Sequence, residues 1–151
     1  MTTQAPQDLI VRPARESDLA YVRASWCSSW TEHATVRTIQ RASPGEIQKR
    51  WWSLIASLIS VGKVLVAVHP DAPEHVIGWL CYEPTTPRRL HYCHVRRTFQ
   101  RLGVATRLLQ EAGIDLHDPK AHVLYSHRTQ ASDRIRTPDC WRCEGWLLIG
   151  V

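Results

Sequence analysis

No stretch of this 151-residue sequence approaches the roughly 20 apolar residues that a helix needs to cross a bilayer. Residues 61–68 are the longest candidate, but they contain Gly62 and Lys63 and are typical of a strand. The N-terminus also lacks a basic start followed by an apolar core, so we expect no secretory signal. We therefore expect a cytoplasmic protein with no membrane partner, whose five cysteines stay reduced.

Patterns that bind metals are scarce as well. The sequence contains one C-x-x-C, formed by Cys140 and Cys143, and neither a second C-x-x-C nor an H-x-x-x-H accompanies it. Because a structural zinc site needs four ligands, this pair alone is a weak signal. We expect no metal and interpret both residues as ordinary thiols.

Lysine is rare too, so the formal net charge of +5 rests mainly on arginine. Arginine suits bidentate contacts to phosphate better than lysine does. A cofactor with several phosphate charges would account for part of this charge, and a nucleic-acid partner is the alternative. Six arginines cluster around a predicted turn at residues 96–101, where we expect the phosphates to bind: Arg88, Arg89, Arg96, Arg97, Arg101 and Arg107.

The length and the hydrophobic fraction of 44% are those of one globular domain, which we place at residues 9–151 after a disordered segment at residues 1–8. Alternation predicts strands at residues 9–13, 63–68, 76–83, 90–95 and 122–126. Helical spacing predicts one helix that contains Trp26 and Trp30, a second that Ser43 caps, and a third after Gly103. We expect an α/β (α+β) fold with a mixed, mostly antiparallel sheet flanked by helices. The C-terminal part is short, and residues 146–149 are our candidate for a last strand.

The most informative segment is residues 95–105, where a predicted strand ends, a basic turn follows, and Gln100-x-x-Gly103-x-Ala105 opens a helix. Small residues let an anion approach the backbone closely, and the first turn of a helix offers unpaired N–H groups to it. The helix dipole adds partial positive charge there. The segment therefore predicts a site for a phosphorylated cofactor, although close packing between helix and strand is an alternative explanation for the small residues.

This arrangement resembles the GCN5-related N-acetyltransferase (GNAT) family, whose cofactor signature is Arg/Gln-x-x-Gly-x-Gly/Ala after a strand with an apolar end. Residues 9–19 resemble the family's first strand and helix, and residues 76–80, with their isoleucine–glycine pair, resemble its third strand. The resemblance implies acetyl-CoA as the acetyl donor. It also implies that main-chain amides cradle the pyrophosphate and that the strand before the turn pairs with the pantetheine arm. The cofactor-binding residues that follow are His94, Val95, Arg97, Gln100, Arg101, Leu102, Gly103, Val104, Ala105 and Thr106.

The resemblance also suggests roles in catalysis. The N–H group of Cys93 would point at the thioester oxygen. His91 is the first candidate for the general base, because alternation places it on the strand face of Cys93 and Val95, and a histidine at equivalent spacing has a similar role in arylalkylamine acetyltransferases. Glu83 is the second candidate. The alternatives are that His91 is only packed in the core and that Glu83 is only a surface carboxylate. We assign no general acid, because Tyr125 is the last tyrosine in the sequence and lies on a predicted strand.

The function that we predict is transfer of an acetyl group from acetyl-CoA to a primary amine, by direct attack on the thioester. A small molecule or a peptide would be the acceptor, and a homodimer is compatible with the sequence. The alternative is a non-catalytic module on the same fold that binds CoA or a nucleic acid.

Overall fold

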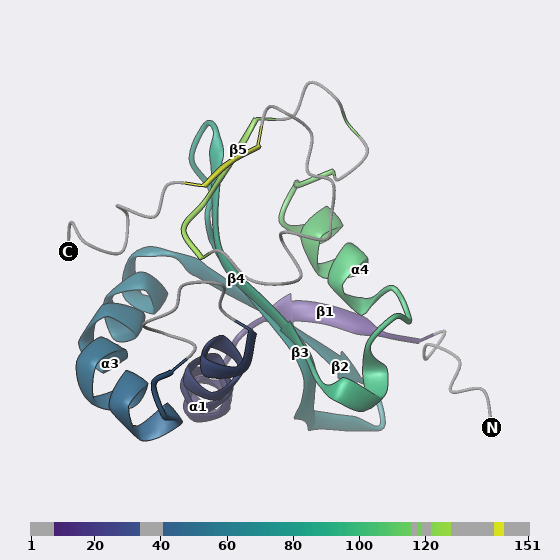
Figure 1. The fold of residues 1–151 in the computed structure, drawn as a ribbon. Helices are drawn as coiled ribbons and strands as arrows, with labels where there is room; N and C mark the ends of the chain where they lie inside the picture. Colours follow the sequence, from purple (N-terminus) through teal and green to yellow (C-terminus); the bar gives the residue numbers. More distant parts are fainter. Residues whose placement is uncertain (1–7, 34–40, 116–117, 119–121, 128–140, 144–151) are drawn as a thin grey trace.

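The computed structural model describes residues 8–33, 41–115, 118, 122–127 and 141–143. Its strands form one sheet in chain order (Figure 1). The first four strands pair antiparallel, and the pairs β4–β5 and β5–β6 are parallel. The strands are β1 (Ile10–Pro13), β2 (Lys63–His69), β3 (Ala72–Glu83), β4 (Arg88–Val95), β5 (Val123–Tyr125) and β6 (Trp141–Cys143). The prediction of a mixed, mostly antiparallel sheet is confirmed.

Helices cover both faces of this sheet. The helices α1 (Glu16–His33) and α3 (Pro44–Val61) lie together against one face, and α4 (Val104–Glu111) lies against the other (Figure 1). A short 3-10 turn, η1 (Arg97–Phe99), connects β4 to the turn before α4. Because β4, α4 and β5 form a crossover between parallel strands, the segment that resembles the cofactor signature lies at the end of a central strand.

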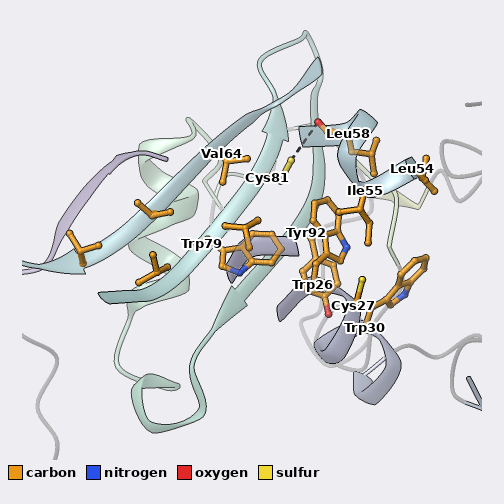
Figure 2. Packing of buried hydrophobic residues seen from close by; sticks show 14 residues of the cluster. Trp26, Cys27, Trp30, Leu54, Ile55, Leu58, Val64, Trp79, Cys81 and Tyr92 are labelled. Atoms are coloured by element: carbon orange, nitrogen blue, oxygen red, sulfur yellow. Dashed lines mark hydrogen bonds between the residues drawn. The ribbon is translucent and has the colours of Figure 1, made fainter. Parts of the chain in front are cut away.

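The core on the α1/α3 face is aromatic (Figure 2). Trp26 and Trp79 are fully buried, with ring centroids 5.2 Å apart, and Tyr92 stacks on both of them. Trp30 is also buried there, with the half-buried Trp51 packed beside it. Such tilted and offset pairs stabilise a core beyond the area that they bury.

Two features of the sequence position the helices. Ser43 and Glu46 form the predicted capping box: the Glu46 N–H donates to Ser43 Oγ, and the Ser43 N–H donates to the Glu46 carboxylate. On the other face, α4 packs tightly on the sheet at Gly78. A Cβ atom at Gly78 would lie 2.9 Å from the His94 carbonyl oxygen and 3.2 Å from Val104 Cγ1. The isoleucine–glycine pair of β3 thus lets the start of α4 approach the sheet.

Several boundaries differ from the predicted ones. β3 begins at Ala72, because a short turn at Pro70 and Asp71 suffices to connect β2 to β3. The last described strand is β6, which the sequence pattern did not indicate, whereas residues 1–7 and the candidate strand at residues 146–149 lie outside the described residues. None of the described helices is long and apolar enough to span a membrane.

Candidate functional site

The main-chain amides of the turn between β4 and α4 form the first part of the site. Gly103 caps α4 with a φ of 82°, in the left-handed region that favours glycine, and the first bond of the helix runs from the Arg107 N–H to the Gly103 carbonyl oxygen. Among the described residues, nothing accepts a hydrogen bond from the amides of residues 102–106. A Cβ atom at Gly103 would meet no atom within 4 Å. The space beside Gly103 is therefore open, and it lies at the positive end of the helix dipole.

Only part of the arginine cluster is available to this turn. Arg97, Arg101 and Arg107 are exposed around it. Arg96 instead donates from Nε to the Val76 carbonyl oxygen, and its guanidinium lies 4.2 Å from the centroid of the Tyr21 ring.

Arg88 lies at the other end of α4, where its Nε donates to the Ala112 carbonyl oxygen. The prediction that six arginines surround the turn is therefore wrong for this residue. Its guanidinium satisfies one of the carbonyl groups that the end of the helix leaves without an intrahelical partner.

The free edge of β4 lies next to the turn. The bond from the Arg96 N–H to the Ile77 carbonyl oxygen places the main-chain groups of residues 94 and 96 toward β3. Main-chain groups alternate in an antiparallel pair, so those of Cys93 and Val95 face away from β3. The Val95 carbonyl oxygen accepts a bond from Gln100 Nε2, 3.0 Å away, which closes the turn onto the strand.

On that outer edge, β5 pairs with β4 only over residues 88–90. The last bond of this pair runs from the Ser126 N–H to the Leu90 carbonyl oxygen. Residues 91–95 extend beyond it, and the N–H groups of Cys93 and Val95 have no partner among the described residues. The main chain of His94, by contrast, is part of the ladder with β3, so an added strand would pair with Cys93 and Val95.

The alternation argument for His91 is wrong, because β4 has an irregularity at this residue. Cys81 pairs with Tyr92 and Tyr82 pairs with Leu90, so His91 is an extra residue in β4. Leu90, Cys93 and Val95 pack on the α4 side of the sheet. The His91 ring faces the α1/α3 side, where it contacts Glu83 and Ser126.

Both ring nitrogens of His91 have hydrogen-bond partners. Nε2 lies 2.8 Å from Glu83 Oε2, and Nδ1 lies 3.0 Å from Ser126 Oγ. Burial lowers the pKa of His91, whose residue is only 2% exposed, and the bond to Glu83 offsets this in part. The side chain of Glu83 is 18% exposed and also lies 3.9 Å from Arg89 Nη1.

Sequence reasoning missed the residues that lie behind His91. Ser126 Oγ lies 2.8 Å from His127 Nδ1, and the Trp26 indole N–H donates to His127 Nε2 over 3.1 Å. Ser126 and His127 follow β5 directly, and both are buried. Their place after a predicted strand was visible in the sequence, but their contact with Trp26, about a hundred residues away along the chain, was not.

The lowered pKa values of His91 and His127 predict how the stability of the protein depends on pH. Burial lowers the pKa of His127 well below its ordinary value and also lowers that of His91, so the unfolded chain binds more protons. We expect their contribution to the free energy of unfolding to be complete above about pH 6.5 and to be lost as the pH falls toward the folded-state pKa values. Each contributes a slope of up to about 1.4 kcal/mol per pH unit. Urea unfolding from pH 7.5 to 5 measures it.

His127→Gln should flatten this slope, while His75→Gln, at an exposed position of β3, should leave it unchanged. Equal slopes in the wild type and the His127 variant would contradict the assignment. Lower overall stability of the His127 variant is expected in any case, because a buried hydrogen bond is lost.

Cys27, Cys81 and Cys93 are poor nucleophiles. Burial raises the pKa of Cys93 to about 12 and that of Cys81 to about 12, and it also raises the pKa of Cys27. A thiol reacts as its thiolate, so these residues stay protonated and inert near neutral pH. Among the described residues there is no group of three or more side chains that could hold a metal ion. Cys140 lies outside the described residues.

Solved structures share this architecture over much of the chain. A proposed acetyl transferase from Pyrococcus furiosus matches with a TM-score of 0.53 and 21% identity, over 70% of this chain and 72% of that one. A GCN5-related N-acetyltransferase from Rhodopseudomonas palustris matches with a TM-score of 0.52 and 18% identity, over 75% and 66%. A "histone acetyltransferase HPA2 and related acetyltransferase" from Corynebacterium glutamicum matches with a TM-score of 0.52 and 14% identity, over 70% of each chain.

No protein-family model and no curated protein sequence matches the chain. The similarity therefore lies in the arrangement of strands and helices, with α1 and α3 on one face of the sheet and α4 on the other. It confirms, at the level of the fold, the resemblance first noted in residues 95–105. The chain has the fold of the GCN5-related N-acetyltransferase superfamily.

Proposed function

We propose that this protein transfers the acetyl group of acetyl-CoA to a primary amine. One observation carries the proposal: within the described part of the chain, the amides at the start of α4 have no partner, and they lie directly beside an edge of β4 that is also unpaired there. A diphosphate needs a cluster of N–H donors, and an extended amide-bearing arm needs a strand edge. CoA contains both groups in one molecule.

Acetyl-CoA would use the chain's own groups in sequence. The amides of residues 102–106 hold the pyrophosphate, with Arg97 and Arg101 at its flanks. The pantetheine amides pair with the outward main-chain groups of Cys93 and Val95. Acetyl-CoA supplies the activated thioester, and the Cys93 N–H is the donor for its carbonyl oxygen.

The transfer is direct. The amine nitrogen bonds to the acetyl carbon, the bond from that carbon to sulfur breaks, and CoA leaves as the thiolate, which takes up a proton. The protonated thiols of Cys27, Cys81 and Cys93 support this route over an acetylated cysteine, since none supplies a thiolate.

Glu83 is our candidate to receive the amine proton, directly or through one water. Its carboxylate is partly exposed on the α1/α3 face, whereas His91 is buried with both ring nitrogens engaged. His91 then acts on Glu83 as a hydrogen-bond partner. This reverses the order of preference that alternation suggested.

A two-part experiment tests the function. Titration calorimetry measures acetyl-CoA binding, and release of free thiol from acetyl-CoA is followed over a panel of small amines and lysine-containing peptides. We expect micromolar binding and amine-dependent thiol release, within the ordinary range of enzyme KM values of 1 μM to 1 mM. Binding without release for any amine would favour a CoA-binding module. Binding of nucleic acid with a steep salt dependence, without acetyl-CoA binding, would overturn the proposal.

A further inference from the structure

A chain of hydrogen bonds runs from Glu83 into the core of the protein. It passes from Glu83 Oε2 to His91, from His91 to Ser126, from Ser126 to His127, and ends at the Trp26 indole. Its four contacts measure 2.8, 3.0, 2.8 and 3.1 Å. All members except Glu83 are buried. In such a chain the direction of each bond depends on the direction of its neighbour.

The direction is set at the inner end. The indole N–H only donates, so His127 Nε2 must accept from Trp26. A neutral imidazole has one N–H group, which in His127 is therefore on Nδ1, toward Ser126 Oγ.

The remaining bonds follow from this one. Ser126 Oγ accepts from His127 Nδ1, so the Ser126 hydroxyl proton is free to donate to His91 Nδ1. His91 then carries its own proton on Nε2 and donates it to Glu83 Oε2. Each member donates toward Glu83, which accepts at the exposed end.

We propose that Trp26, His127 and Ser126 are positioning residues that hold His91 as a hydrogen-bond donor to Glu83. This bond orients the Glu83 carboxylate. A proton cannot be relayed inward along these hydrogen bonds. Such a relay would reverse every bond and put a proton on His127 Nε2, which would then face the Trp26 N–H, a group that cannot accept a hydrogen bond. The contribution to catalysis rests on the proposed role of Glu83 in acetyl transfer; the direction of the chain does not.

The other side chains that contact these hydrogen-bonded residues are compatible with this direction of the bonds. The Arg89 guanidinium, whose Nη1 lies 3.9 Å from Glu83 Oε2, is a second donor group beside this carboxylate. His127 packs against the rings of Trp26, Trp30 and Tyr92, with centroids 4.4 to 5.3 Å away. Tyr92 directs its hydroxyl at Ser29 Oγ instead, 2.9 Å away.

The tautomers of the two histidines are the first test, and they are measured without any substrate. Nitrogen-15 NMR of the wild-type protein should show His127 protonated on Nδ1 and His91 protonated on Nε2. Trp26→Phe removes the indole N–H and should give a measurable population of the His127 Nε2–H tautomer. Trp79→Phe is the matched control, since its buried indole N–H donates to Ser25 Oγ, outside the chain. The opposite tautomer at either histidine of the wild type would overturn the proposal.

Ser126→Ala is the second test, with a smaller disturbance of packing. His91 Nδ1 loses its donor, so we expect a mixed His91 tautomer and about a tenfold loss of kcat with an unchanged KM for acetyl-CoA, the order expected when a charged hydrogen bond is misdirected. Ser126→Thr keeps the hydroxyl and should restore the single His91 tautomer and the wild-type kcat. Ser29→Ala, which removes another buried hydroxyl, should change neither.

The outcomes separate this inference from the proposed function. If acetyl-CoA does not bind, the proposed function is wrong, but the histidine tautomers still test the direction of the hydrogen bonds from Trp26 to Glu83. If the protein is active but Ser126→Ala and Ser29→Ala have the same tautomers and the same kcat, the positioning role is wrong and the function stands.

Discussion

Gly103→Trp is expected to reduce acetyl-CoA binding below detection. The amides of residues 102–106 have no partner among the described residues, and a Cβ atom at Gly103 would point into open space. A large ring placed there would occupy the volume that a diphosphate needs to reach those N–H groups. Titration calorimetry with acetyl-CoA measures the effect. We expect a loss of at least about a hundredfold, since several charge-assisted hydrogen bonds depend on this approach.

The control for this variant is Gly103→Ala. Both substitutions place a side chain on a residue with a φ of 82° and share the resulting strain, of the order of 1–2 kcal/mol. A methyl group meets nothing within 4 Å, so binding should weaken much less than with tryptophan. Equal losses in the two variants would attribute the effect to strain at the helix start, and wild-type affinity in Gly103→Trp would place the diphosphate elsewhere.

Glu83→Gln is expected to lower kcat by about 10²–10⁴-fold, the usual contribution of a general base. The glutamine amide oxygen still accepts a hydrogen bond from His91 Nε2, so the packing of the site is retained while the basic group is lost. We therefore expect an unchanged affinity for acetyl-CoA. The rate should also lose the acidic limb of its pH profile, which steady-state kinetics from pH 5 to 9 measures.

Glu74→Gln is the matched control, because it neutralises an exposed carboxylate on the same strand, β3. It should leave kcat and the pH profile unchanged. A Glu83→Gln variant with wild-type kcat would remove Glu83 as the proton acceptor. If His91→Ala then lost activity together with its acidic limb, the base would be His91, as alternation first suggested.

Local patterns predicted the elements of this fold well because their causes are local. The capping box at Ser43 and the helical spacing of Trp26 and Trp30 act within a few residues, and each appears in the structure as predicted. Alternation failed at His91, where the extra residue in β4 moves the ring to the opposite face of the sheet. A bulge depends on how a strand pairs with its neighbour, which no period within the strand reveals.

The candidate site divides in the same way. Residues 95–105 are contiguous, so the sequence alone sufficed to predict the turn and the helix that follows it, where we propose that an anion binds. The chain from Glu83 to Trp26 joins β3, β4, the end of β5 and α1, and its direction depends on one indole N–H in the core. Only the packed structure decides it, because hydrogen bonds between buried side chains form after distant segments have met.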